Sequence, residues 1–121
     1  MTINPKTEGK PLIASNKVEG TAVYDPQGER LGTIYNFMVD KEKGTVEYAV
    51  MSFGGFLGIG ENYHPLPWNV LTYDPDRGGY VVDLDKDALK DAPSYPPGEE
   101  PLYDHAYGEA VYGFYGVPYI I

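Results

Sequence analysis

The residues that look best placed for chemistry lie in a glycine-rich stretch, SFGGFLGIGENYHPLPW, which runs from Ser52 to Trp68. A phosphate-binding loop needs backbone N–H groups that converge on the anion, a helix directly after the loop, and usually a lysine. The glycines here follow the order G-G-x-x-G-x-G, which matches neither the P-loop nor the dinucleotide-binding pattern. The segment from Glu61 to Pro65 also does not favour a helix, so the spacing does not predict a phosphate site.

The apolar residues between these glycines leave two interpretations open. In the first, the segment is a long connection between two strands, and its apolar side chains fold over the end of the protein's own sheet. In the second, Phe56, Leu57 and Ile59 contact a second copy of the chain, because exposed apolar clusters tend to mark interfaces. We take these three residues as candidate interface residues and expect a homodimer.

The acidic run Asp83–Asp87 resembles the start of a calcium-binding loop. A complete loop would need glycine at its sixth position and glutamate at its twelfth, where this chain has Ala88 and Ser94. Asp85 is better explained as the residue that caps the N-terminus of a short helix. The run therefore does not predict a calcium site.

The remaining reactive side chains do not form a recognisable catalytic set. His64 and His105 lie far apart in the sequence, and neither has another histidine two to four residues away, as a metal site on one element would need. No serine lies in a G-x-S-x-G motif, and the absence of cysteine excludes thiolate chemistry and disulfides. The sequence thus predicts no catalytic residue, no metal and no cofactor, and we expect the protein not to be an enzyme.

The charge of the chain restricts its partners. The formal net charge is −9, and residues 74–121 hold 10 acidic and 3 basic residues, with no Lys or Arg after Lys90. Such a surface repels nucleic-acid phosphates and anionic membranes, so we expect no direct nucleic-acid binding. The N-terminal residues have no apolar core of signal-peptide length, and no stretch approaches the ~20 apolar residues of a spanning helix. We therefore expect no membrane span and a cytoplasmic location.

The elements that must position these residues are mostly strands. Short β-rich runs are separated by Gly, Pro, Asp and Asn, and helical periodicity is nearly absent before residue 85. In the clearest run, alternation places Val46, Tyr48 and Val50 on one face and Ala49 and Met51 on the other. The predicted strands are Thr21–Tyr24, Leu31–Val39, Thr45–Phe53, Trp68–Tyr73 and Tyr80–Leu84, with Leu12–Val18 as a further candidate at the front.

Three turns connect these runs in a similar way. YDPQGERLG (Tyr24–Gly32) and YDPDRGGYV (Tyr73–Val81) are near copies, and Lys41–Gly44 provides a third turn. In the two copies, Asp accepts backbone hydrogen bonds, Pro fixes φ of the first central position, and Gly takes a left-handed conformation. Hairpins at this regular spacing predict a small antiparallel barrel or sandwich.

The pattern of apolar residues changes after Leu84, where the β-rich runs end. We expect a short helix that starts at Asp85 and ends before Pro93, followed by an extended linker, Ser94–Pro101. The next apolar residues recur at helical spacing and predict a short amphipathic helix that ends before Pro118. A helix of this length is marginal alone, so its apolar stripe must dock on its own barrel, a second subunit or a partner. These further candidate interface residues are Tyr103, Tyr107, Val111 and Phe114.

The region starting at about residue 10 resembles the PRC-barrel domain. The matching elements are VEGTAVYD at Val18–Asp25, D-x-x-x-G at Asp40–Gly44, the GGFLGIG loop, and PLPW at Pro65–Trp68. The family takes its name from the cytoplasmic part of the photosynthetic reaction-centre H subunit. It also includes the C-terminal domain of a ribosome-maturation factor and many small stand-alone bacterial proteins. The resemblance implies a compact six-stranded barrel and no common catalytic residues.

We therefore predict an all-β protein: a small six-stranded antiparallel barrel of PRC type with a short C-terminal helical extension. Residues 1–9 form an N-terminal arm, residues 10–93 the barrel, and residues 94–121 a linker and an amphipathic tail. A set of aromatic residues either lines a ligand pocket or fills the core and rim of the barrel. This set comprises Tyr24, Tyr48, Trp68, Tyr73 and Tyr80.

The function that fits these observations is a non-enzymatic protein-interaction or assembly module that self-associates and binds an unidentified protein partner. One alternative is an acidic adaptor in ribosome or RNA maturation that acts through a basic protein partner. Another is a small-ligand or metal-binding barrel with a stress-related role.

Overall fold

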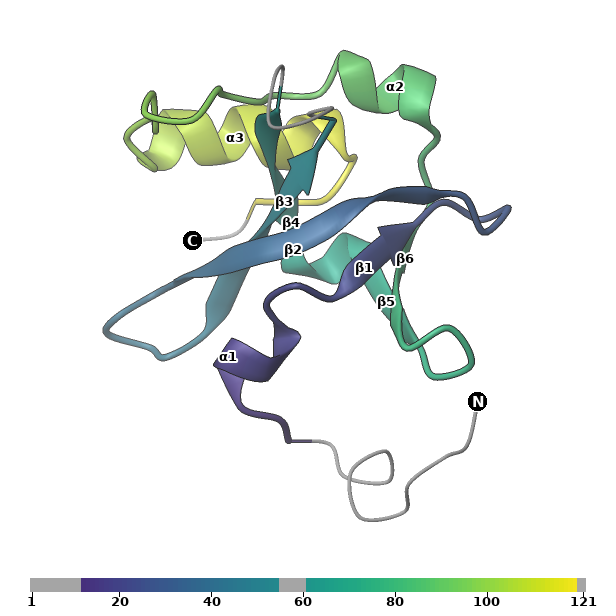
Figure 1. Cartoon of the computed structure of the whole chain (residues 1–121). Helices are drawn as coiled ribbons and strands as arrows, with labels where there is room; N and C mark the ends of the chain where they lie inside the picture. Colours follow the sequence, from purple (N-terminus) through teal and green to yellow (C-terminus); the bar gives the residue numbers. More distant parts are fainter. Residues whose placement is uncertain (1–11, 55–60, 120–121) are drawn as a thin grey trace.

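The computed structural model describes residues 12–54 and 61–119, and the strands of this region form one six-stranded sheet (Figure 1). The order of strands across the sheet is β4-β3-β2-β1-β6-β5. Neighbouring strands are antiparallel except β1 and β6, which run parallel with Val23 opposite Tyr80. The strands are β1 (Ala22–Tyr24), β2 (Arg30–Val39), β3 (Val46–Phe53), β4 (Asn62–Pro67), β5 (Leu71–Asp74) and β6 (Gly79–Val82).

The predicted fold class is confirmed as mostly β with six strands, but two of its details are wrong. The sheet is mixed rather than antiparallel, and within the described residues its end strands β4 and β5 do not pair, so that it forms a half-barrel. The cause lies at η1 (Trp68–Val70), a 3-10 turn where the sequence predicts the start of a strand. This turn carries the chain from the β4 edge to the β5 edge, so β6 returns beside β1 in the same direction (Figure 1).

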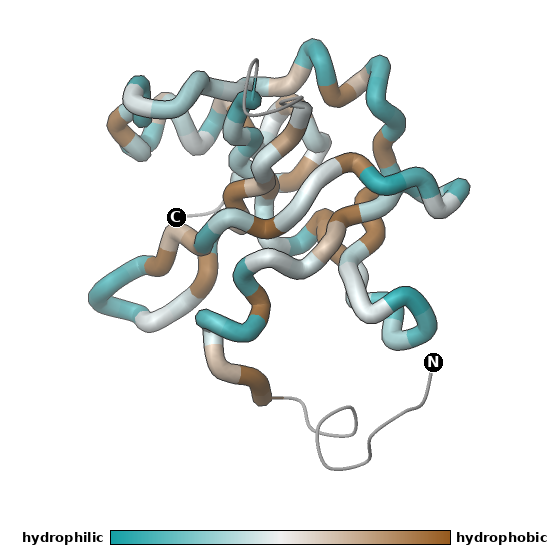
Figure 2. Tube along the Cα trace, in the orientation of Figure 1, coloured by the Kyte–Doolittle hydropathy of each residue, from teal (hydrophilic) through white to brown (hydrophobic). Residues whose placement is uncertain are grey.

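The hairpin turns have the predicted geometry. The carboxylate of Asp25 accepts a hydrogen bond from the backbone N–H of Glu29 at 2.8 Å, and Gly28 has a φ of 89°. The turns that begin at Asp40 and Asp74 also use a carboxylate that accepts backbone N–H groups. Figure 2 shows hydrophilic residues gathered in these peripheral turns, away from the sheet.

The segments directly before the first strand and directly after the last strand differ in how well the sequence predicts them. The strand expected over Leu12–Val18 is wrong, because residues Ser15–Val18 form a short helix, α1. Only Val18 is buried there, so the segment has no alternating apolar face that a strand could bury. By contrast, α2 (Lys86–Lys90) starts where predicted, and the Asp85 carboxylate accepts a hydrogen bond from the backbone N–H of Ala88 at 2.8 Å.

Two separate hydrophobic clusters lie on the two faces of β3. The inner cluster includes Ala49 and Met51 of β3 together with Ile34 and Leu66 from the neighbouring strands. The outer cluster is centred on Tyr48, which precedes Ala49 and points to the opposite face, and on the C-terminal helix. The middle of β3 is therefore buried on both sides, although antiparallel sheets commonly leave one face to water.

The C-terminal helix α3 (His105–Phe114) covers this outer face. The Asp104 carboxylate caps its first turn by accepting a hydrogen bond from the backbone N–H of Tyr107 at 2.9 Å. At its other end the backbone N–H of Val117 donates to the carbonyl of Tyr112 at 3.0 Å, and Gly116 has a φ of 71°. This is the Schellman arrangement, and it stops the helix before Pro118 as predicted.

Candidate functional site

The residues predicted to form an interface fall into two groups. Phe56, Leu57 and Ile59 lie outside the described residues, and their role in a dimer stays a prediction. Tyr103, Tyr107 and Val111 lie between α3 and the chain's own sheet, and the side chain of Val111 is completely buried. Phe114 keeps 38% of its surface exposed. The structure thus decides one open question, because the tail docks within the same chain.

Polar contacts reinforce this docking. The hydroxyl of Tyr112 donates a hydrogen bond to the backbone carbonyl of Glu47, on β3, at 2.6 Å. The ring of Tyr48 meets the rings of Tyr103 and Tyr112 edge-on, with centroid distances of 5.1 and 5.5 Å. Because tyrosine combines a large apolar ring with a polar tip, each of these residues fills space and also bonds at the margin of the cluster.

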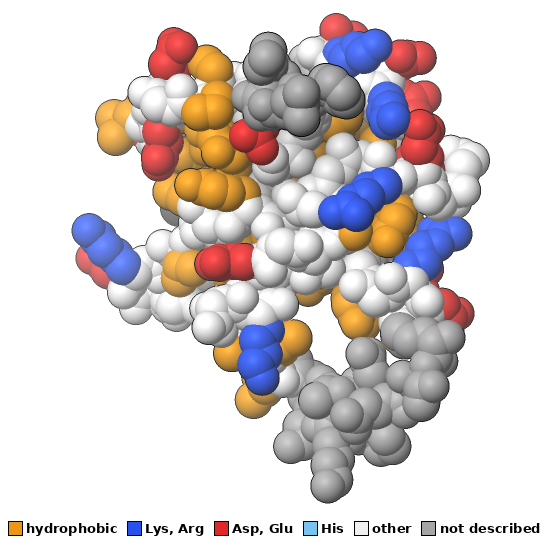
Figure 3. All heavy atoms as spheres, in the orientation of Figure 1, with side chains coloured by type: hydrophobic (Ala, Val, Ile, Leu, Met, Phe, Trp, Pro, Cys, Tyr) orange, Lys and Arg blue, Asp and Glu red, His pale blue; other side chains and the backbone are white. Residues whose placement is uncertain are grey.

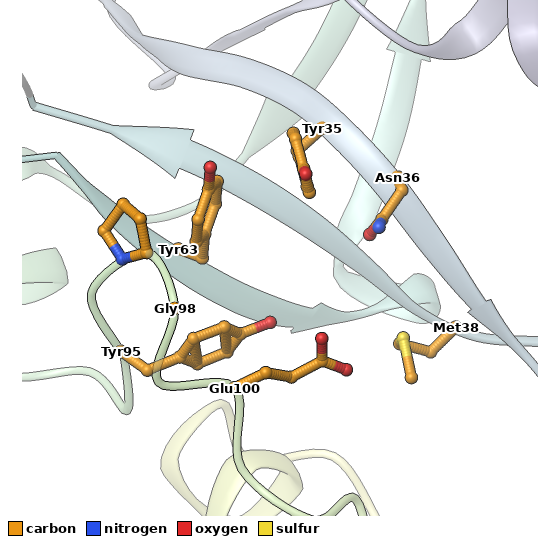
Figure 4. A pocket seen from close by; sticks show the side chains of 8 residues that line it. Tyr35, Asn36, Met38, Tyr63, Tyr95, Gly98 and Glu100 are labelled. Atoms are coloured by element: carbon orange, nitrogen blue, oxygen red, sulfur yellow. The ribbon is translucent and has the colours of Figure 1, made fainter. Parts of the chain in front are cut away.

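Beside the docked tail, the structure contains an open cavity of about 460 Å³ that we call the tyrosine cleft (Figure 4). Its floor is the outer face of β2, and its walls come from β4 and from the segment that leads to α3. Asn36 and Met38 face outward because their partners in the register are the outward residues Val50 and Tyr48. The cleft is lined by Tyr35, Asn36, Met38, Tyr63, Tyr95, Pro97, Gly98 and Glu100.

A β-bulge places Tyr35 at the mouth of the cleft. The register between β2 and β3 shifts between Ile34 and Asn36, so Tyr35 has no partner of its own across the strand pair. Such a bulge redirects the side chain that it carries. The Tyr35 side chain is 52% exposed, while its ring still lies 4.6 Å from that of Tyr63, measured between centroids.

The linker before α3 supplies the opposite wall. Tyr95 forms a bridge with Tyr63 on the edge strand β4, through N···O distances of 2.8 and 3.0 Å. A tight turn follows, in which Gly98 has a φ of 83° and the backbone N–H of Glu99 donates to the carbonyl of Pro96 at 3.2 Å. The predicted extended linker is therefore tied to the sheet edge, and it leads directly to Glu100.

The cleft is connected to the docked tail by a hydrogen bond. The hydroxyl oxygens of Tyr95 and Tyr103 lie 2.7 Å apart, and Tyr103 belongs to the cluster under α3. The ring of Tyr95 also lies 5.8 Å from that of Tyr63. Three tyrosines from β2, β4 and the linker thus follow one another along the wall, and the last of them is fixed by the tail.

The electrostatic character of the cleft is neutral to negative. Burial raises the pKa of Tyr63 and of Tyr95, and the nearby carboxylates Glu61 and Glu100 raise them further, so both hydroxyls stay protonated near neutral pH. The amide oxygen of Asn36 is buried and accepts no hydrogen bond from the described residues. None of the residues that line the cleft is basic.

The two histidines lie outside this cleft, and they belong to different elements of the fold. His64 lies on the inner face of β4 opposite Met51, and burial lowers its pKa to about 4. His105 is exposed at the start of α3, where its Nε2 lies 2.7 Å from a carboxylate oxygen of Glu109. Among residues 12–54 and 61–119, no group of three or more His, Cys, Asp or Glu side chains is arranged to hold a metal ion.

The sequence does not single out the residues that build the cleft. The aromatic residues that it does suggest serve elsewhere: Tyr80 is in the inner core, Trp68 packs against it, and Tyr48 is under the tail. The sequence does contain one sign of the bulge at the cleft. The Tyr35-Asn36 pair interrupts the alternation of β2 between the inward residues Ile34 and Phe37. Such an interruption indicates a bulge, and bulges often occur near functional sites.

Comparisons with known proteins give one family and two partial similarities. The profile of the PRC-barrel domain matches residues 11–89. An uncharacterized protein from Deinococcus radiodurans is 30% identical over 76 residues, which are 63% of this chain and 27% of that protein. This chain therefore spans about a quarter of that relative's length.

A crystal structure of a putative 16S ribosomal RNA processing protein RimM from Pseudomonas aeruginosa is similar with a TM-score of 0.42. The two sequences are 21% identical, and the match covers 67% of this chain and 49% of that one. None of the helices in the part of the chain that the structure describes is long and apolar enough to cross a membrane.

Proposed function

The chain belongs to the PRC-barrel domain family, and on this premise we propose that it is a non-enzymatic protein-interaction module whose contact surface is the tyrosine cleft. The observation that carries the proposal is the cleft itself, an open cavity with a volume of about 460 Å³ and three tyrosines in its wall. Tyrosine is enriched at protein interfaces because it offers a large rigid contact area and a hydrogen-bonding tip.

The way the cleft is held supports a binding role. The backbone bridge between Tyr63 and Tyr95 and the hydroxyl contact between Tyr95 and Tyr103 fix two of its walls before any partner arrives. A surface that is already ordered loses less conformational entropy on binding than a flexible one. The position of the tail also leaves this part of the outer face open while it covers the adjoining part.

The chemistry of the lining supports a role without catalysis. Glu100 is the one carboxylate among the lining residues, and it is exposed on a turn without a histidine, a second acid or a nucleophilic side chain beside it in the lining. General acid–base catalysis depends on a side chain positioned against the reacting group, usually with a partner that tunes its proton affinity. His64, which is buried and neutral at physiological pH, lies on the other face of the sheet.

The experiment is a comparison of three full-length proteins in a pull-down: the wild type, Tyr35→Ala and Tyr73→Ala. Tyr73 is a matched control, because it is an exposed tyrosine on β5, at the far edge of the sheet. A partner captured by the wild type is identified, purified and measured by titration calorimetry. We expect binding to survive Tyr73→Ala and to weaken by about tenfold with Tyr35→Ala. Equal affinity for all three proteins would refute the cleft as the contact surface.

Self-association is a separate part of the proposal, and it rests on the sequence of the glycine-rich segment. A homodimer formed through Phe56, Leu57 and Ile59 would give twice the monomer mass in light scattering after size exclusion. The double variant Phe56→Asp and Ile59→Asp would then run as a folded monomer. A monomeric wild type at all concentrations would refute this part and leave the cleft proposal intact.

The adaptor interpretation requires a basic protein partner. The tail holds Glu99, Glu100, Asp104 and Glu109 but no Lys or Arg, so its surface favours a positively charged partner. Figure 3 shows acidic and hydrophobic side chains side by side over the tail, with no Lys or Arg among them. A partner from ribosome or RNA maturation in the pull-down would support this second candidate.

A further inference from the structure

The side chains that line the cleft indicate which chemical group of a partner protein would bind there. We infer that the tyrosine cleft binds the guanidinium group of an arginine on a basic partner protein. This inference rests on the proposed function, because it names the group that the partner inserts into the contact surface already described.

The first argument is the distribution of hydrogen-bonding groups. Figure 4 shows Glu100 and Asn36 directed into the cavity from opposite sides. The carboxylate of Glu100 is an acceptor, and the buried amide oxygen of Asn36 accepts nothing from the described residues. Glu100 is exposed, so its carboxylate can accept from a ligand directly, whereas the Asn36 oxygen is shielded from solvent and must turn toward the cavity to do so. The cleft therefore favours a group rich in N–H donors.

The second argument is the arrangement of the rings. Tyr35 and Tyr63 are tilted by 34° with centroids 4.6 Å apart, and half of the Tyr35 surface is exposed. A guanidinium that lies within about 6 Å of a tyrosine ring face is attracted by the ring quadrupole. The chain already uses this contact elsewhere, since the Arg77 guanidinium carbon lies 5.8 Å from the centroid of the Tyr24 ring.

The third argument separates arginine from other ligands. An anion would meet the carboxylate of Glu100 and the acidic residues of the tail, so nucleotides and acidic peptides are disfavoured. A lysine ammonium is a compact charge, whereas a guanidinium is planar and carries five N–H donors. A planar group that stacks on Tyr35 keeps its N–H donors free at its edge for an acceptor such as Glu100, whereas an ammonium has no flat face to stack.

A chain segment of a partner fits better than a free small cation. A cavity of about 460 Å³ falls in the range of pockets that enclose a drug-sized group, so it has room for a side chain and part of its backbone. The cleft is also open to solvent, so an extended segment can pass over it. The acidic tail next to it would attract the other basic residues of such a segment.

The test uses the full-length protein and four blocked peptides that differ at one position, which is Arg, citrulline, Lys or Glu. Citrulline has the shape of arginine without its charge. The binding of each peptide is followed by NMR titration at low salt. We expect the citrulline and lysine peptides to bind at least about fivefold more weakly than the arginine peptide, and the glutamate peptide to show no binding. Equal affinity for arginine and citrulline would overturn the inference.

Three variants locate the peptide on the protein. Glu100→Gln removes the carboxylate of the cleft, and Glu99→Gln removes the neighbouring charge, which does not line it. We expect Glu100→Gln and Tyr35→Ala each to weaken the arginine peptide by about fivefold, and Glu99→Gln to change its affinity by less than about twofold. Equal effects of both glutamine variants would show attraction by overall charge alone, and would overturn the inference.

The two proposals fail in different ways. If Tyr35→Ala abolishes partner capture but the arginine and citrulline peptides bind equally, the cleft is the contact surface and the guanidinium inference is wrong. If Tyr35→Ala leaves partner capture unchanged, the proposed function itself is wrong. Heteronuclear NMR spectra of each variant confirm that it is folded before its affinity is compared.

Discussion

Lowering the pH from 7 to 4 is expected to destabilise the protein through His64, and replacing this residue with leucine should remove that part of the effect. His64 is only 2% exposed, and its ring meets that of Phe53 edge-on at 5.3 Å. Its Nδ1 atom is buried and has no hydrogen-bond partner among the described residues. The imidazolium that forms on protonation would therefore be placed in an apolar core, with no counter-charge beside it among the described residues.

The magnitude follows from the pKa of His64 in the two states. Burial lowers this pKa from 6.5 to about 4 in the folded protein. Between these values the unfolded chain binds the proton more readily, so the free energy of unfolding decreases as the pH falls from 6.5 towards 4. The contribution is fully present above pH 6.5. With 1.36 kcal/mol for each pKa unit, the loss at pH 4 is about 3 kcal/mol.

The assay is urea denaturation of the wild type and His64→Leu at pH 7 and pH 4. Carboxylates titrate in both proteins, so the difference between the two pH-induced losses isolates His64. The control is His105→Gln, because this variant removes the other histidine from an exposed site and leaves the core intact. Equal losses for the wild type and His64→Leu would refute the reasoning, since they would mean that His64 is solvated or can move to water when it is protonated.

Two further predictions concern the tail, and both are measured by urea denaturation at pH 7. Val111→Asp should destabilise the protein by about 3 kcal/mol because it buries a charge under α3, whereas Phe114→Asp, on an exposed site, should change stability by less than about 1 kcal/mol; similar values would contradict the docking. Gly113→Ala should stabilise by about 0.5–1 kcal/mol, since a Cβ there meets nothing within 4 Å. Gly108→Ala should instead destabilise by about 1 kcal/mol, because its Cβ would clash with the ring of Tyr119. A gain in stability would refute this close contact.

The local parts of the fold were predictable because they depend on neighbouring residues. The turn that starts at Asp25 needs an acceptor and a left-handed glycine a few residues apart, and both are visible in the sequence. Asp85 and Asp104 precede the two later helices, and both act as N-caps. A cap needs only a short acceptor side chain directly before the first helical turn, so the sequence alone reveals it.

The long-range parts of the fold were not predictable in the same way. The β-prone residues Tyr80, Val81 and Val82 indicate that β6 is a strand, but not that it joins β1 in parallel. That direction depends on the 3-10 turn at Trp68–Val70, which has the β-prone composition of a strand. The helix at Ser15–Val18 was missed for a related reason, because the apolar residues Leu12 and Ile13 suggest a buried strand although both are exposed.

The cleft escaped prediction because its residues come together only through strand register. Tyr63 and Tyr95 are brought together by a bridge at the β4 edge, and Tyr35 by a bulge two strands away. Twelve tyrosines occur in the chain, so composition does not reveal which of them share a wall. Glu100 is likewise one of many acids, and its importance depends on the turn at Gly98 that directs it into the cavity.

The tail links the stability of the sheet to the shape of the cleft. Tyr95 pairs with the β4 edge through its backbone and contacts Tyr103 through its hydroxyl, so the linker wall depends on the docking of α3. Undocking the tail would expose the outer cluster around Tyr48 and would also remove one side of the cleft. By linkage, a ligand that binds only the assembled cleft must stabilise the docked tail relative to the undocked tail. The size of this stabilisation is set by the concentration and affinity of the ligand. The proposed binding at the cleft would therefore be coupled to the order of the C-terminal helix.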